Sequence, residues 1–324
     1  MSYAHYLKEI ASGEADLPER EAQRLFGAML DGGVPELELG ALLLALQMKR
    51  MAYSELSGFA NAVNERLFRL TVPTGKALPV VLPSYGGSRD RPNLLPLLAL
   101  LLQRFGVPVL VHGMLHGEGN VASAYVFREL GVMPCASRAQ VQDVLAAQGL
   151  AFAPTAVLAP GLAELLALRG RLGLRTVAHA VARLLDPVEA DSLRVIGVAE
   201  EVAFDLTRDY LLAGGMRALL LRDGQGEPCA DPANRPRMEY LYDGLANILF
   251  EAELTTSRKI ATLPAGGDAV STAAWIRRAL AGETPVPLPL VNQLASCLYA
   301  AGYTGDMNQA KAIVAVETGS LAAA

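Results

Sequence analysis

Cysteine is scarce in this sequence, and its spacing excludes two kinds of scaffold. Only three of the 324 residues are cysteine, Cys135, Cys229 and Cys297, and they form no CxxC pattern. Disulfide frameworks and thiolate zinc sites need cysteines at short, repeated spacings. The spacing of His112, His116 and His179 also fits no familiar zinc pattern. We therefore expect buried thiols and no bound metal.

Long apolar runs are missing as well. The run at residues 94–102 contains Pro96 and is followed by Gln103 and Arg104, so it is well short of the roughly 20 residues that cross a bilayer. The first residues, MSYAHYLKEI, contain no basic region followed by an apolar core, so no secretory signal is expected. These observations predict a cytoplasmic protein without a membrane partner.

Positive charge is not in excess. The net charge is −5, and 52% of the residues are hydrophobic while 19% are charged. This balance is typical of a folded globular protein and speaks against one coated in positive charge. A basic groove confined to one face remains compatible with it.

The pattern of apolar residues divides the chain into two domains. Through the first 70 residues it has helical spacing, interrupted by Pro18 and by the turn at residues 31–35. After a linker at 72–75, short apolar runs alternate with helical stretches, and we expect strands at 78–82, 107–111, 195–198 and 218–221. The predicted fold class is α/β, with a small all-helical domain at 1–70 and a large α/β domain at 75–324 around a mostly parallel sheet.

Three loops follow the carboxyl ends of these strands, at residues 84–89, 112–119 and 222–227. In open α/β sheets ligands bind beyond that edge. We expect the three loops to surround one crevice.

Three segments give the chain a family resemblance. Residues 39–58 (LGALLLALQMK…SELSG), 152–176 (FAP…LRGRLGLRT) and Val111-His112-Gly113 resemble the anthranilate phosphoribosyltransferases over most of the chain. The resemblance implies a phosphoribosyltransferase fold of the anthranilate and nucleoside-phosphorylase type. It also implies that the helical domain, with a contribution from about residues 176–187, forms a homodimer.

The segments that would bind substrate depart from the family pattern. The family's GTGGD loop reads Ser-Tyr-Gly-Gly-Ser here, which keeps Gly86 and Gly87 and places Ser88 where the aspartate stands. The family's N-x-S-T keeps only Asn93, and its KHGNR keeps His112 and a glycine. Backbone amides of such a glycine loop can hold a diphosphate, but the usual partner side chains are absent.

One carboxylate, Glu227, remains of the family's magnesium-binding pair, and Arg169 matches the arginine that faces the aromatic acid. We therefore assign no catalytic residue and regard His112, Arg169 and Glu227 as a degenerate site. The departures are shared with a divergent branch that the chain resembles, the YbiB-like paralogues, which are described as nucleic-acid-binding homodimers.

Arginines are concentrated near the altered motifs. Arginine forks pair with phosphates and keep their charge, so such a rim could follow a nucleic-acid backbone. A solvated surface with ordinary ion pairs is the alternative for these residues. The candidate phosphate-binding or nucleic-acid-binding residues are Gly86, Gly87, Ser88, Arg89, Arg91, Asn93, Arg169, Arg171, Arg175 and Arg183.

Two functions follow as hypotheses. The first is a non-catalytic homodimer that binds DNA or RNA through phosphates, with little sequence preference and no cofactor. The alternative is a working phosphoribosyltransferase that uses Mg²⁺ and an altered acceptor. Tyr85 could stack on a base under the first hypothesis, or it could be a packed loop residue.

Overall fold

The computed structural model describes residues 3–13, 16–72, 75–89, 91–117, 119–222, 226–254, 263–264 and 267–319. Contacts between elements divide the chain into two compact units. The first comprises residues 1–69 and 155–187, and the second comprises 70–154 and 188–324. The second segment of the helical unit is therefore longer than the contribution from about 176–187 that the resemblance implied.

The first unit is entirely helical over its described residues. It contains α1 (Ala4–Ser12), α2 (Glu19–Leu30), α3 (Glu36–Met48), α4 (Tyr53–Asn64), α8 (Thr155–Leu158), α9 (Pro160–Ala167), α10 (Arg169–Leu172) and α11 (Val177–Ala182). Its core forms where α2 packs on α4, and the rings of Phe26 and Phe59 stack there with centroids 4.8 Å apart. Gly58 permits this packing, because a Cβ at that position would lie 2.4 Å from the Glu19 carbonyl oxygen.

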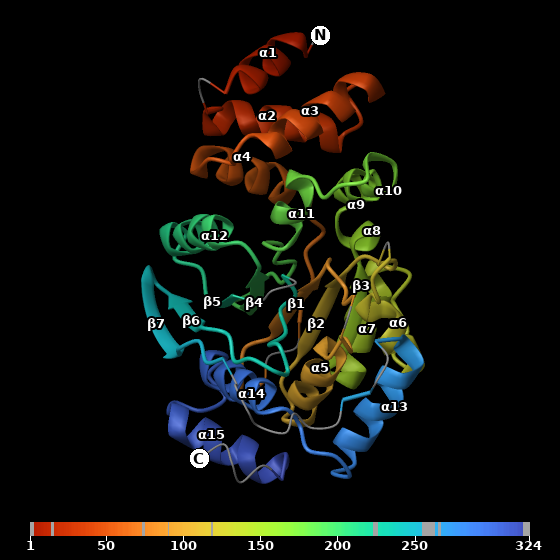
Figure 1. Cartoon of the computed structure of the whole chain (residues 1–324), viewed down its shortest axis with the longest axis vertical. Helices are drawn as coiled ribbons and strands as arrows, with labels where there is room; N and C mark the ends of the chain where they lie inside the picture. The colour runs from red at the N-terminus through yellow and green to blue at the C-terminus, as the bar shows by residue number, and fades with distance from the viewer. Residues whose placement is uncertain are drawn as a thin grey trace. The chain divides into compact units, whose positions relative to one another are not determined.

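The second unit is built on a seven-stranded sheet in the order β3-β2-β1-β4-β5-β6-β7 (Figure 1). Neighbouring strands from β3 to β5 are parallel, and β6 and β7 add an antiparallel hairpin at one edge. The strands are β1 (Val80–Ser84), β2 (Val109–Gly113), β3 (Leu150–Pro154), β4 (Leu193–Val198), β5 (Ala218–Arg222), β6 (Met238–Tyr242) and β7 (Leu245–Phe250). β1 to β4 are buried along their whole length, as in a parallel sheet covered on both faces.

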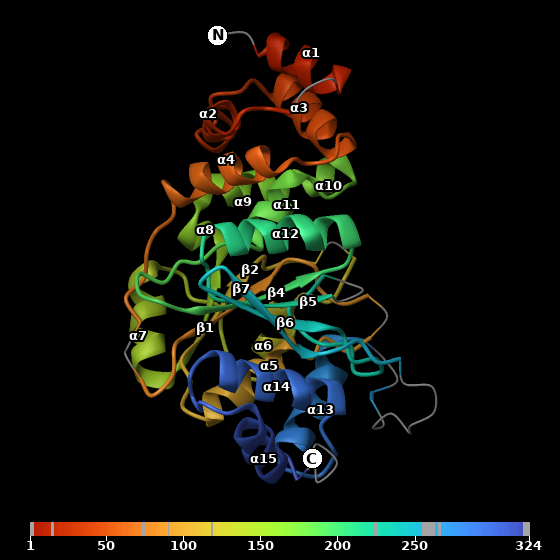
Figure 2. The same cartoon turned by 90° about the vertical axis from the view of Figure 1, so that its left-hand side faces the viewer.

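Helices of the second unit lie on both sides of its sheet. Figure 2 shows α12 on one side and α5 and α14 on the other. The helices are α5 (Leu95–Arg104), α6 (Ser123–Glu129), α7 (Arg138–Gln148), α12 (Glu201–Ala213), α13 (Ala269–Leu280), α14 (Leu288–Ala300) and α15 (Met307–Glu317). Within the part of the chain that the structure describes, none of the helices is long and apolar enough to cross a bilayer.

The predicted α/β class with a mostly parallel sheet and a helical N-terminal domain is confirmed. The four predicted strands correspond to β1, β2, β4 and β5, with their ends shifted by up to two residues. β3, β6 and β7 were not predicted. The β6–β7 hairpin turns at Asp243 and Gly244, with φ of 50° and 75°, and Asp-Gly between apolar runs is a recognisable hairpin signal.

Candidate functional site

The glycine loop follows β1 at residues 85–88, as the sequence indicated, and is anchored to a second loop. Ser88 and Val121 exchange two backbone hydrogen bonds of 3.1 and 2.7 Å. Gly87 has a φ of 64°, and a Cβ there would lie 3.0 Å from both the Asn120 Cβ and the Val121 carbonyl oxygen. Only glycine meets both requirements without strain, so the sequence fixes the tight curve of this loop.

The amides of the glycine loop converge on the carboxylate of Glu227. Its Oε1 accepts hydrogen bonds from the N–H groups of Tyr85 (3.2 Å), Gly86 and Gly87 (3.0 Å). Successive N–H groups that converge in this way form an anion-binding concavity. Glu227 is only 6% exposed, so the chain supplies the anion of this concavity itself.

A close backbone approach brings Glu227 to this position. β4 passes behind it at Gly197, where a Cβ would lie only 1.9 Å from the Glu227 carbonyl oxygen. Any other residue at 197 would push the Glu227 backbone away from the glycine loop. Gly197 therefore helps to set the depth of the carboxylate.

A chain of buried polar side chains supports the other oxygen of Glu227. Oε2 lies 3.2 Å from the Ser84 hydroxyl, and that hydroxyl lies 2.8 Å from the hydroxyl of Ser123. Asn93 Nδ2 donates to Ser123 Oγ at 3.0 Å and also to the Val121 carbonyl at 3.0 Å. Asn93, predicted as a phosphate ligand, is thus engaged within the protein. Ser84 was predicted in the crevice loop but not as a site residue, and Ser123 was not predicted at all.

Two further residues named from the sequence, Tyr85 of the loop and His112, are buried and packed against each other. His112 lies on β2 and is fully buried, so the expectation that it belongs to a loop is wrong. The Tyr85 hydroxyl and His112 Nδ1 are 2.9 Å apart. Because Tyr85 is also buried, its ring is not presented for stacking on a base, and the packed alternative describes it correctly.

Arg89 and Arg91 lie on the far side of the loop and differ in their partners. Arg89 is exposed, and its Nε donates to Asn120 Oδ1 at 3.3 Å. Arg91 forms an ion pair with Asp231, and its carbonyl oxygen accepts a 2.6 Å hydrogen bond from the Ser88 hydroxyl. Arg91 therefore ties the loop to the segment around Asp231, although its side chain is also 45% exposed.

The predicted arginines at 169–183 belong to the first unit, where they create a positive field. Three of them act on His179, a buried residue of α11. Burial, followed by the charges of Arg175, Arg169 and Arg183, lowers the pKa of His179 to about 3. The Thr176 N–H donates to His179 Nδ1 at 3.2 Å, which suits a neutral imidazole. Arg89 and Arg91 belong to the second unit.

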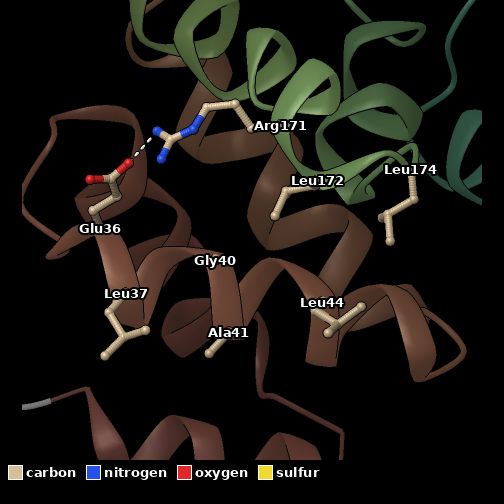
Figure 3. Close-up of a pocket in the computed structure, with 8 residues that line it drawn as sticks. All are labelled: Glu36, Leu37, Gly40, Ala41, Leu44, Arg171, Leu172 and Leu174. Atoms are coloured by element: carbon tan, nitrogen blue, oxygen red, sulfur yellow. Dashed lines mark ion pairs between the residues drawn. The ribbon is translucent and has the colours of Figure 1, made fainter.

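A hollow of about 590 Å³ lies between α3 and the segment after α9 in the first unit. Arg171 spans one side of it through an ion pair with Glu36, and Leu172 and Leu174 point toward α3 (Figure 3). The lining residues are Glu36, Leu37, Gly40, Ala41, Leu44, Arg171, Leu172 and Leu174. Arg171 thus has an acidic partner on α3, in a pair whose side chains are both exposed.

Magnesium does not fit the carboxylate that the sequence singled out. A cation needs carboxylate oxygens turned toward it, whereas Glu227 Oε1 receives three backbone N–H groups and Oε2 faces a hydroxyl. Within the described ranges, no three His, Cys, Asp or Glu side chains gather as a metal-binding group.

The sheet order, the helical unit and the glycine loop place the chain in the anthranilate phosphoribosyltransferase class of folds. The enzyme from Thermus thermophilus superposes with a TM-score of 0.79 at 26% identity, covering 97% of this chain and 94% of that one. The Saccharomyces cerevisiae enzyme in complex with PRPP and Mg shares the fold alone, with a TM-score of 0.78 at 14% identity, covering 98% of this chain and 93% of that one.

Sequence comparison assigns the chain more closely. A model of the glycosyl transferase family, helical bundle domain, matches residues 4–66. Anthranilate phosphoribosyltransferase from Methanosphaerula palustris is 28% identical over 98% of this chain and 94% of its own length. YbiB from Escherichia coli is 36% identical over 97% of this chain and 99% of its own. The chain belongs to the YbiB family, a branch of the anthranilate phosphoribosyltransferase-like proteins.

Proposed function

We propose that this protein is a non-catalytic homodimer that binds nucleic acid through phosphate contacts with little sequence preference. The main support for the proposal is that the Glu227 carboxylate accepts hydrogen bonds from the backbone amides of Tyr85, Gly86 and Gly87. A diphosphate would need those same three N–H groups, and each backbone N–H has a single hydrogen to donate. The fold supplies the scaffold of a transferase, but its anion concavity is already filled.

Charge supports a polymeric phosphate ligand in place of a small one. Three arginines act together on the pKa of His179, so positive charge is concentrated around α10 and α11 although the whole chain carries −5. In the second unit Arg89 is turned toward solvent next to the filled loop. Guanidinium groups spread over a surface suit successive phosphates, each of which releases counterions when it is neutralised.

An apolar stripe on α3 supports self-association. Leu37, Ala41, Leu44 and Met48 are exposed and spaced by four, three and four residues, so they lie along one face of the helix. Leu37 is 87% exposed and Leu44 is 45% exposed. The spacing matches the seam with which helices pack on one another, and a second copy of the same stripe is its natural partner.

Fluorescence anisotropy with labelled single-stranded DNA, duplex DNA and RNA across a salt series tests nucleic-acid binding. We expect a Kd on the order of micromolar at physiological ionic strength and a steep loss of affinity with salt. Arg89→Gln should reduce both the affinity and the salt slope. Arg104→Gln is the matched control, since Arg104, at the end of α5, donates to the carbonyl of Leu280 at the end of α13. Absence of binding even at low salt would refute the proposal.

Incubation with PRPP, Mg²⁺ and anthranilate tests the non-catalytic part, and we expect no turnover. Micromolar binding followed by turnover with anthranilate would establish the transferase alternative. Light scattering after size exclusion tests the dimer, which Leu37→Glu with Leu44→Glu should dissociate. Leu245→Glu on β7 is the control, because Leu245 is an exposed leucine outside the stripe. A cytoplasmic location stays a prediction.

A further inference from the structure

A second polar pocket, of about 390 Å³, lies in the α/β unit where β5 ends and β6 begins. Arg222 is the last residue of β5, and Glu239 pairs with Leu220 across the sheet. Arg208 comes from α12, which contacts both strands. The pocket therefore lies at the carboxyl edge of the parallel strands, where open α/β sheets place ligands.

The floor of this pocket is built around one buried carboxylate, Glu239. Arg208 Nε donates to its Oε2 and Arg237 Nε donates to its Oε1, both at 2.8 Å. Two guanidinium groups thus share the negative charge of Glu239, and the whole lining holds three arginines and three carboxylates. Each group donates only its Nε hydrogen to Glu239, so the terminal Nη groups keep donors for another acceptor. Arg237 Nη1 lies 3.9 Å from the exposed Glu251.

The rim of the pocket carries a third arginine in a weak pair. Arg222 Nη2 lies 3.6 Å from Glu201 Oε2, and the two side chains are 52% and 74% exposed. An exposed pair at this distance contributes little and opens easily. Glu201 begins α12, so the positive end of the helix dipole adds to the attraction for an anion. Asp205, one turn further along, is the other acidic group of the lining.

We propose that this pocket binds a phosphate group, held by Arg208 and Arg237 on the Glu239 scaffold and closed by Arg222. Glu201 swings away as the ligand enters, because phosphate offers Arg222 a bidentate acceptor of higher charge. The volume is at the low end for small-molecule sites and suits a free phosphate compound such as a nucleotide. A phosphate of a polynucleotide carries the same chemistry, and in that case the inference rests on the proposed function.

Calorimetry with inorganic pyrophosphate and anisotropy with a labelled single-stranded oligonucleotide test the pocket in the full chain. Arg222→Gln with Arg237→Gln should weaken pyrophosphate binding by about tenfold or more, since each loses a charged hydrogen bond. Glu201→Gln should strengthen it by about threefold, because the competing carboxylate is removed. Arg278→Gln is the control, since Arg278 lies on α13, outside the pocket lining, is 60% exposed and is 3.7 Å from Glu283.

The outcomes separate the inference from the proposed function. If the unaltered protein does not bind pyrophosphate, or if the double variant binds it equally well, the proposed phosphate site is refuted. This holds regardless of the result with the oligonucleotide. If the double variant loses both ligands, the site serves the polymer. If it loses pyrophosphate but keeps the oligonucleotide, the site serves a free phosphate compound. Thermal unfolding of each variant confirms that the fold is retained.

Discussion

Two buried glutamates of the α/β unit meet positive groups in opposite ways. Glu227 receives three backbone N–H groups on one oxygen, and Glu239 receives one Nε–H from each of two arginines. A backbone amide has one hydrogen, so a single acceptor uses it up, whereas a guanidinium has five donors. The same carboxylate thus closes an anion site when it faces amides and builds one when it faces arginines.

Of the two glutamates, Glu227 should have the larger effect on stability when its carboxylate is removed. Glu227→Ala leaves three buried amides without their acceptor, each costing about 1–3 kcal/mol. Allowing for a water that enters the space, we expect the free energy of unfolding to fall by about 3–5 kcal/mol, a loss found for few single substitutions. Urea denaturation followed by circular dichroism measures it.

An exposed glutamate provides the control for that experiment. Glu253 is 61% exposed and pairs with Arg235 at 2.9 Å, so Glu253→Ala should cost no more than about 1 kcal/mol. Equal losses at the two positions would show that the amides of the glycine loop do not depend on Glu227. The account of the filled concavity would then fail.

The corresponding change at Glu239 should have a smaller effect. Glu239→Gln removes the charge shared by Arg208 and Arg237, but both arginines are partly exposed and regain water. We expect a loss of about 2 kcal/mol, below the range for fully buried pairs. A double-mutant cycle with Arg208→Gln should give a coupling energy of about 1–2 kcal/mol. A coupling near zero would mean that Glu239 does not position Arg208.

The sequence predicts the glycine loop much better than it predicts the carboxylate that the loop binds. Gly86 and Gly87 after a buried run predict a tight loop at the end of β1, and the structure places one there. The partner carboxylate, Glu227, comes 140 residues after Gly87, and no local pattern announces that contact. The sequence marks Glu227 only as the remnant of a metal site, so its actual hydrogen bonds could not be predicted without the fold.

Apolar runs revealed β1, β2, β5 and most of β4, but the equally apolar β3 was missed. The runs of β1, β2, β4 and β5 are easily recognised, whereas β6 carries Glu239 and Tyr240 among its apolar residues. β6 pairs on both sides, and its charged residue is buried against arginines from α12 and from the segment before β6. A buried charge satisfied by distant arginines looks like a surface residue in the sequence, so both the strand and the arginine pocket were missed.

His179 extends the comparison to the helical unit. Its buried imidazole lies near arginine charges, as the glutamates lie near positive groups, but it carries no negative charge. Its pKa of about 3 lies below the ordinary value of 6.5, so the unfolded chain binds a proton in this window and the folded chain does not. Stability should be full above pH 6.5 and should fall by about 1.4 kcal/mol per pH unit as the pH drops toward 3.

Urea denaturation of the protein and of His179→Gln over that pH range measures this contribution. The variant should have a flatter dependence on pH, because it lacks the group that protonates on unfolding. His116→Gln is the matched control, since His116 is exposed. An identical pH dependence for the protein and His179→Gln would contradict the arginine field that we place around α11.

The smallest effect concerns how closely the loop around Glu227 is packed. Gly87 and Gly131 both have positive φ, 64° and 86°, but a Cβ meets neighbours at 3.0 Å only at Gly87. Each substitution by alanine pays the left-handed strain of about 1–2 kcal/mol. Gly87→Ala should cost about 1 kcal/mol more than Gly131→Ala, because Asn120 and Val121 must move as well. Equal losses would mean that the loop can shift without disturbing Glu227, and the concavity would then be open to other anions.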